Sequence, residues 1–352
     1  DAARGLGITV LALGVDTALV ANLASTESDP FPEPRRRPPP IPGAARQLPP
    51  LPGEHLVAEE DVEVEDETAP QIEPLAVRRT GVVIGIDLGT TNTCVSYVVD
   101  GKPRIIPGRT GTNTIPSMIT FEPDGSYHVG QRAADRQVLQ PLRTVYGWKR
   151  LVGRTFREEL AAELQRHFAY PLGEAAEQRF GIRLDDDVVS MDTIAARVLE
   201  EVRSTAEAHL GESVEAAVIT VPAYFSEVQR EAVRRAAREA KLAVHRIVNE
   251  PTAAAVAYGH KQGGRARVAV WDFGGGTFDF SVVDVSEAQL EVIATGGDNF
   301  VGGADFDDLL AAHLFAEFQR AEGLAGDPDP QQIARLREAV LAALRAAGGE
   351  RE

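Results

Sequence analysis

Hydrophobic and polar residues follow a repeating pattern from about residue 80 onward, and the pattern predicts strands that alternate with helices. Two runs of mostly β-branched or apolar residues, 82–86 and 268–271, are each followed by a short segment rich in glycine and threonine. A second strand-like run comes next in each case, at 94–99 and at 278–283. The chain therefore contains two predicted strand–turn–strand units that are far apart in the sequence.

Three segments between these units contain helix start and stop signals. A helix is expected over 190–211, where a serine N-cap precedes apolar residues at helical spacing and Gly211 ends the pattern. A second helix is expected over 226–240, beginning with a capping box, and a third over 251–258, with proline in its first turn and Gly259 as its cap. The strands expected between these helices cover 216–221 and 243–248. Such alternation predicts an α/β fold with mixed sheets.

The first 79 residues differ in composition and are expected to form a leader that is mostly disordered. Residues 6–24 are mostly apolar but include Asp16, which leaves two interpretations: a membrane anchor, or the remnant of a helix. Residues 30–52 are dense in proline and predict an extended spacer. Residues 54–73 are acidic and predict disorder.

The net charge excludes some classes of binding partner, and the cysteine content indicates the type of cellular compartment. With 36 basic and 53 acidic residues, the formal net charge is −17, which argues against nucleic-acid binding because such proteins need a basic face. A single cysteine, Cys94, excludes an intrachain disulfide and suits a reducing compartment. We expect a cytoplasmic location, with a possible membrane anchor at 6–24. If that segment spans a membrane, the basic residues 35–37 just beyond it favour a cytoplasmic location for the rest of the chain.

The two strand–turn–strand units have the same chemistry. The first strand of each unit leads into an aspartate, Asp87 or Asp272, and the following turn contains glycine and threonine. Small residues let backbone N–H groups approach an anion, and carboxylates suit a magnesium ion that keeps part of its water shell. Neither turn has the spacing of a dinucleotide-binding loop or a P-loop. One such turn alone is typical of an ordinary hairpin, but the pair predicts a polyphosphate held between two turns.

Six short motifs occur in a fixed order along the chain. They are Gly85–Asn92, Lys149–Gly153, Ile219–Phe225, Asn249–Ala255, Asp272–Asp279 and Gly302–Asp307. In this order they resemble the ATPase domain of the seventy-kilodalton heat-shock (DnaK-type) chaperones, over residues 81 to about 310. Actin and the sugar kinases share the duplicated hairpin but not the second and fourth motifs.

The resemblance implies a two-lobed actin-like ATPase fold, with ribonuclease H-like lobes and the duplicated β-hairpins as phosphate loops. In the family, a helix supplies a lysine and an arginine around the adenine; here Leu344 stands at the lysine position and Arg345 at the arginine position. A later glycine turn of the adenine pocket does not occur in this sequence, so the second lobe is expected to be truncated. The expected domains are the leader at 1–79, a first lobe with the crossover at 80–264, and a partial second lobe at 265–352.

The resemblance also implies ATP or ADP and magnesium as ligands, and it assigns roles to individual residues. Asp87 and Asp272 are expected to hold magnesium through water molecules. Lys149 is expected to stabilise charge on the γ-phosphoryl group, and Glu250 and Asp279 are expected to position or deprotonate the attacking water. The positions expected to bind nucleotide are Gly89, Thr90, Thr91, Asn92, Gly274, Gly275, Gly276, Thr277, Gly302, Gly303 and Arg345, with Thr277 also donating to the γ-phosphate during catalysis.

The implied function is ATP binding and hydrolysis, with nucleotide state controlling how a peptide-binding domain absent from this sequence holds unfolded clients. A J-domain co-chaperone and a nucleotide exchange factor are the implied partners. Leu344 and the incomplete adenine pocket favour a second interpretation, a non-enzymatic protein of the same fold that senses nucleotide. A sugar or acetate kinase would need an acceptor-binding insertion, which the sequence does not suggest.

Overall fold

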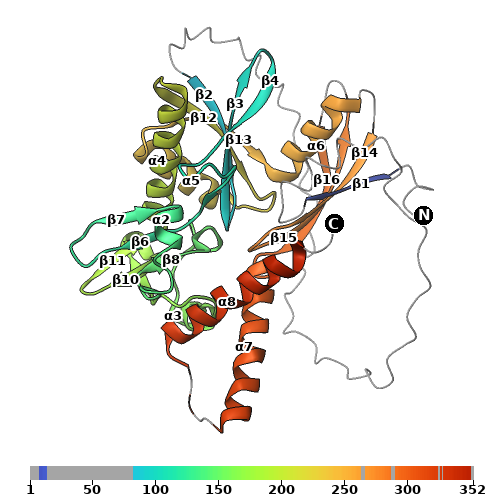
Figure 1. The fold of residues 1–352 in the computed structure, drawn as a ribbon. Helices are drawn as coiled ribbons and strands as arrows, with labels where there is room; N and C mark the ends of the chain where they lie inside the picture. The colour runs from blue at the N-terminus through green and yellow to red at the C-terminus, as the bar shows by residue number, and fades with distance from the viewer. Residues whose placement is uncertain are drawn as a thin grey trace, which may run out of the picture. The chain divides into compact units, whose positions relative to one another are not determined.

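The computed structural model of the chain describes residues 8–13, 82–262, 266–286, 290–323, 326 and 328–349. The predictions for the proline-rich and acidic parts of the leader lie outside these residues. Two larger sheets, two smaller three-stranded sheets and several helices make up the described part of the fold (Figure 1).

The first sheet is mixed and has the strand order β13-β12-β2-β3-β4, with β5 paired to β3. Strands β2, β12 and β13 are parallel, whereas β2, β3 and β4 are antiparallel neighbours. Along β2, Ile84, Ile86 and Leu88 are buried on one face, so Asp87 points to the other. The bounds are β2 (Val82–Leu88), β3 (Asn92–Val99), β4 (Lys102–Ile106), β5 (Ile115–Pro116), β12 (Val214–Val221) and β13 (Ala243–Asn249).

Two helices, α4 (Met191–Leu210) and α5 (Glu227–Glu239), pack against each other and share the core of the first sheet (Figure 1). Ser190 caps the start of α4 by accepting a hydrogen bond from the N–H of Thr193, and Gly211 ends the helix with a φ of 70°. The capping box at the start of α5 is formed as predicted. Local start and stop signals thus predicted both helices to within a residue.

Smaller elements extend this half of the chain. Two three-stranded sheets have the orders β7-β6-β8 and β11-β10-β9. The bounds of these elements are β6 (Ile119–Phe121), β7 (Tyr127–Val129), α2 (Gln131–Ala134), β8 (Thr144–Val145), the 3₁₀ turn η2 (Trp148–Arg150), α3 (Glu158–Leu164), η3 (Gln165–His167), β9 (Leu172–Ala175), η4 (Ala176–Gln178), β10 (Arg179–Leu184) and β11 (Asp187–Ser190).

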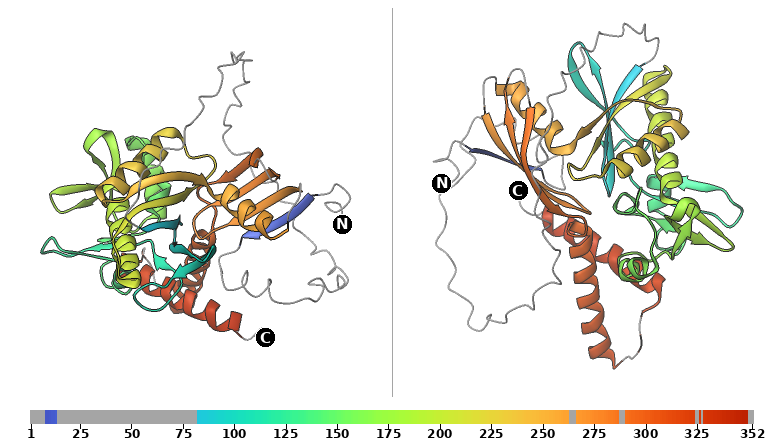
Figure 2. Two further views of the ribbon diagram at one scale, coloured as in Figure 1. Left: turned by 90° about the horizontal axis from the view of Figure 1, so that it is seen from above. Right: turned by 180° about the vertical axis from the view of Figure 1, so that it is seen from behind.

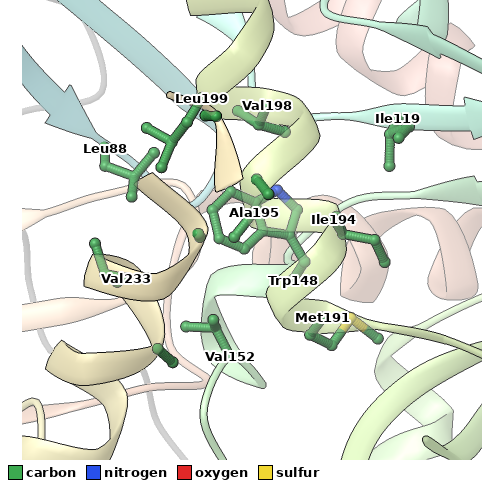
Figure 3. Close-up of a cluster of buried hydrophobic side chains, with 14 of the residues drawn as sticks. Leu88, Ile119, Trp148, Val152, Met191, Ile194, Ala195, Val198, Leu199 and Val233 are labelled. Atoms are coloured by element: carbon green, nitrogen blue, oxygen red, sulfur yellow. The ribbon is translucent and has the colours of Figure 1, made fainter. Parts of the chain in front are cut away.

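Trp148, the first residue of η2, is completely buried in the core of this half. Figure 3 shows its ring among apolar side chains of α4 and α5, such as Ala195 and Val233. Its indole N–H donates to the carbonyl of Ser117 at 2.9 Å. A large ring with a satisfied polar group fixes the short turn that also contains the predicted catalytic lysine.

The second sheet has the order β1-β14-β15-β16 and is covered on one face by α6 (Figures 1 and 2). Strand β1 runs parallel to β14, and β14, β15 and β16 are antiparallel neighbours. Ala255 of α6 packs with Val268, Val270 and Val283 in a second buried cluster. The bounds are β1 (Ile8–Leu13), α6 (Glu250–Gln262), β14 (Ala266–Phe273), β15 (Phe278–Val285) and β16 (Leu290–Asp298).

The described chain ends in two helices, α7 (Gly303–Glu322) and α8 (Pro330–Gly349), which contact each other. The helix predicted around Leu336–Arg345 is therefore present and is longer than its motif suggested. Asp308 of α7 and Arg337 of α8 form an ion pair between the two helices.

Two local predictions differ from the structure. Gly259 does not cap α6, because the helix continues to Gln262: a single helical glycine is tolerated when the flanking residues favour helix. Within the apolar segment 6–24, residues Ile8–Leu13 form strand β1 and not a helix, and the rest of the segment lies outside the described residues. Its β-branched and apolar residues suit the edge of a sheet. Among the helices that the structure describes, none is long and apolar enough to span a membrane.

Gly153→Ala is expected to destabilise the chain by about 2–4 kcal/mol. Gly153 has a φ of 71°, and a Cβ there would lie 2.8 Å from the Cα of Gln229 in α5, a backbone atom that cannot easily move. Gly211→Ala is the matched control, since Gly211 has a φ of 70° but open space around its Cα, so the backbone strain alone of about 1–2 kcal/mol should appear. Denaturant unfolding measures both, and equal losses would contradict the steric contact.

Candidate functional site

The two glycine- and threonine-rich turns lie directly against each other. The first turn, Gly89–Thr91, joins β2 to β3, and the second turn, Gly274–Thr277, joins β14 to β15. A Cβ at Gly275 would lie 2.2 Å from Thr91 Oγ1, and a Cβ at Gly276 would lie 2.3 Å from Thr90 Cγ2. These distances leave no room for a side chain, so the close approach of the turns requires glycine at both positions. The structure thus brings together two motifs that are widely separated in sequence.

Two backbone N–H groups and one side chain donate hydrogen bonds to the carbonyl groups of the second turn. The N–H of Gly303 donates to the carbonyl of Gly274 at 3.0 Å, and the N–H of Ala304 donates to that of Gly275 at 2.8 Å. A buried side chain donates to the carbonyl of Gly276. Within the described residues, the N–H groups of Gly275 and Gly276 make no hydrogen bond to the protein. Successive unpaired N–H groups in a tight turn form a concavity that suits an anion.

The backbone of Gly302 and Gly303 packs directly against the backbone of the second glycine turn. Gly302 precedes α7, and a Cβ at this position would lie 2.6 Å from the backbone nitrogen of Gly276 and 2.7 Å from the carbonyl carbon of Gly275. Only glycine allows this backbone-to-backbone packing. The structure places both residues beside the phosphate turn, and their direct contact with nucleotide stays a prediction.

Lys149 and Glu250 form a buried ion pair at the centre of the site. The Lys149 ammonium group donates to Glu250 Oε1 at 2.6 Å, and the two side chains are only 3% and 13% exposed. Lys149 is placed by η2, which Trp148 anchors in the core, and Glu250 is the first residue of α6. The structure therefore pairs two residues to which the family resemblance assigned catalytic roles, across 101 positions of sequence.

An excess of carboxylates surrounds this pair. Burial raises the pKa of Asp272 to about 7, and the charges of Glu250, Asp279 and Asp87 add to the rise. Burial and the charge of Glu250 raise the pKa of Asp279 to about 7 as well. The pKa of Glu250 is raised by burial, and Lys149 opposes the rise in all three groups. Carboxylates that repel one another in this way are stabilised by a cation.

One oxygen of Asp279 is available to a ligand. The side chain is 2% exposed, and the Tyr224 hydroxyl donates to Oδ2 at 3.4 Å. Oδ1 is buried and has no hydrogen-bond partner in the described structure. An unsatisfied buried acceptor costs about 1–3 kcal/mol, so an incoming water or hydroxyl donor would be favoured here. The orphaned oxygen therefore fits the predicted role in orienting a water molecule.

The arrangement also fits a hydrated magnesium ion. Asp87 and Asp272 occupy equivalent positions, one residue before the ends of β2 and β14, and their charges interact. The Thr220 hydroxyl donates to Asp87 Oδ1 at 2.7 Å and orients that carboxylate. In the described part of the chain, no three acidic, histidine or cysteine side chains are grouped to ligate a metal directly. Two carboxylates would suffice for magnesium, because this ion keeps several of its waters.

Three of the positions with an expected or altered role in nucleotide binding lie outside the glycine turns, in β3 and α8. Asn92 begins β3 and is exposed, and Leu344 is 46% exposed on α8, whereas the side chain of Arg345 lies outside the described structure. Sequence reasoning missed the contributions of Thr220 and Tyr224, although both lie in or beside the Ile219–Phe225 motif. That motif was the only sequence signal for them.

Comparison with known families agrees with this geometry. A family model described as Hsp70 protein matches residues 83–347, a range that includes both glycine turns, Lys149 and Glu250. Together with the mixed α/β sheets, the match shows a two-lobed actin-like ATPase fold with an Hsp70-type nucleotide-binding domain, and it supports a function of the chaperone ATPase type. The chain belongs to the Hsp70 protein family.

Proposed function

We propose that the chain binds ATP with magnesium and hydrolyses it to ADP and phosphate, as the ATPase domain of a DnaK-type chaperone. The observation that carries this proposal is the buried Lys149–Glu250 pair among three further carboxylates, beside two opposed glycine turns. Two N–H groups that could bind an anion, a buried cation and an unpaired carboxylate oxygen lie in this site. Phosphoryl transfer needs this combination of positioning and charge stabilisation.

Each residue of the site would have a distinct role in ATP binding or hydrolysis. The N–H groups of Gly275 and Gly276, with the threonines of the first turn, would donate to phosphate oxygens. Lys149 would stabilise the negative charge that develops during transfer of the γ-phosphoryl group. Glu250 and the free oxygen of Asp279 would orient the attacking water, and a pKa near 7 suits Asp279 to accept its proton. Bound magnesium, held through water by Asp87 and Asp272, would neutralise charge on the β- and γ-phosphates.

The chaperone role rests on membership of the Hsp70 family. We propose that ATP hydrolysis controls the binding of unfolded clients by a peptide-binding domain outside these 352 residues, with a J-domain co-chaperone and a nucleotide exchange factor as partners. A cytoplasmic location for the ATPase domain is part of the same proposal.

A nucleotide sensor without turnover is the second candidate. It is favoured by Leu344, which stands where the resemblance places an adenine-binding lysine and which exposes 46% of its surface on α8. Calorimetry with magnesium and ATP, combined with a phosphate-release assay, separates the candidates. Binding without phosphate release supports the sensor, and release that a J-domain protein stimulates supports the chaperone ATPase.

Lys149→Ala is expected to lower the rate of phosphate release by about 100- to 1,000-fold, because it removes the buried cation from the charge that develops in transfer. Lys102→Ala is the control, since Lys102 is an exposed lysine at the start of β4 and should leave turnover unchanged. Thermal unfolding of both variants verifies that they fold. Equal turnover in the two variants would contradict the catalytic role assigned to Lys149.

Asp279→Asn is expected to stabilise the ligand-free chain, and more at about pH 8 than at about pH 5. The pKa of Asp279 is about 7 in the folded chain, above its ordinary value of 3.8, so the folded state holds this proton more tightly than the unfolded state. The carboxylate therefore opposes folding increasingly as the pH rises from about 4 to about 7. We expect a gain of about 1–3 kcal/mol at the higher pH, with a loss of ATP turnover.

Denaturant unfolding at the two pH values measures this effect. Asp186→Asn is the matched control, because Asp186 is an exposed carboxylate in the turn between β10 and β11. Its replacement should give the same small change at both pH values. The electrostatic description of the site is wrong if Asp279→Asn behaves like this control.

A further inference from the structure

Arg150 is a buried cation that the proposed reaction does not use. It follows Lys149 directly in η2, and its side chain is only 5% exposed. Phe300 covers it, with the ring centroid 5.0 Å from the guanidinium carbon. A fully charged guanidinium is rarely buried unless most of its donors are paired, so the contacts of Arg150 show what it holds in place.

Two groups from distant parts of the chain accept hydrogen bonds from this guanidinium. Nε and Nη2 both donate to the carbonyl oxygen of Gly276 in the second turn, at 2.8 and 2.5 Å. Nη1 donates to Asp305 Oδ1 at 3.1 Å, and Nη2 donates to the other carboxylate oxygen. Asp305 lies in the first turn of α7. One rigid, planar group thus ties η2 to both the second turn and α7.

These bonds complete the support of the second turn. The N-terminal N–H groups of α7 already hold the carbonyls of Gly274 and Gly275, and Arg150 holds the carbonyl of Gly276. With the three carbonyls fixed, the peptide planes fix the directions of the free N–H groups of the turn. A lysine could not replace Arg150, because a single ammonium group lacks the planar fork that reaches two acceptors together.

We propose that Arg150 is a positioning residue, which sets the second glycine turn at a fixed distance from Lys149 and aligns its N–H groups with the phosphates. The inference rests on the proposed ATPase function. Because Lys149 and Arg150 are consecutive, the lysine and the turn that would hold the same phosphate share one anchor. A displacement of the turn by about 1 Å would then lower turnover by up to about 100-fold without removing any group that touches the nucleotide.

The chain contains a chemically matched control. Arg143 also donates through Nε to a backbone carbonyl, that of Phe121 at 3.0 Å, and its Nη1 donates to both carboxylate oxygens of Asp185, at 3.1 and 3.0 Å. Its partners belong to β6 and to the turn between β10 and β11, not to the glycine turns. Arg143→Lys therefore removes the same kind of interaction where no phosphate-binding group depends on it.

The test compares the full chain with its Arg150→Lys, Arg143→Lys and Asp305→Asn variants, in two measurements. Hydrogen exchange without nucleotide follows the amides of Gly303 and Ala304, which donate to the second turn. We expect exchange about tenfold faster in Arg150→Lys than in the wild type or in Arg143→Lys, with a smaller change of the same sign in Asp305→Asn. Phosphate release from saturating ATP with magnesium should fall about 10- to 100-fold in Arg150→Lys alone among the arginine variants.

Each result of these measurements supports or contradicts the positioning role of Arg150. Unchanged exchange in Arg150→Lys would overturn the inference whether or not the chain is an ATPase, and so would altered exchange with normal turnover. If Arg150→Lys fails to fold, Asp305→Asn decides by the same two criteria, since it keeps the guanidinium and removes one charge from its partner. A wild-type chain that releases no phosphate would refute the proposed function, and the exchange data alone would then judge the anchoring of the turn by Arg150.

Discussion

The close approach of the two glycine turns is the constraint on which the rest of the site depends. Side chains at Gly275 and Gly276 would overlap with the side chains of Thr91 and Thr90, so the second turn must be glycine where the two hairpins meet. Their meeting brings Asp87 and Asp272, each near the end of its strand, to one place. Position 302 must also be glycine, because its backbone packs on the backbone of the second turn.

That geometry places negatively charged carboxylates close together, and a bound cation would reduce the repulsion between them. Several carboxylates, of which Asp279 is the most deeply buried, lie around one lysine, and loss of solvent together with their mutual repulsion raises the pKa of Asp272 and of Asp279 to about 7. One oxygen of Asp279 is also left without a partner in the described structure. Groups that reduce stability in this way are concentrated at functional sites, and the proposed cation, phosphates and water molecule would offset their cost.

Local signals predicted much of the fold, and distant pairings could not be predicted from them. The N-cap at Ser190, the glycine stop at Gly211 and the β-branched runs act over a few residues, and the elements they predicted are present. Strand β1 depends on its pairing with β14, which is distant in the sequence. The contact between Arg150 and Asp305 spans 155 positions, so no spacing indicates it. Family resemblance, not local pattern, identified Lys149 and Glu250.

The central claim is that the opposed turns and the carboxylate cluster form one site for a phosphate chain with its metal ion. Calorimetric titration of the full chain with ATP, in magnesium and then in a metal chelator, tests it most directly. We predict binding in magnesium and binding at least about tenfold weaker in chelator, because the carboxylates would then repel the phosphates. Binding of equal strength in the two conditions, or no binding in either, would contradict the account.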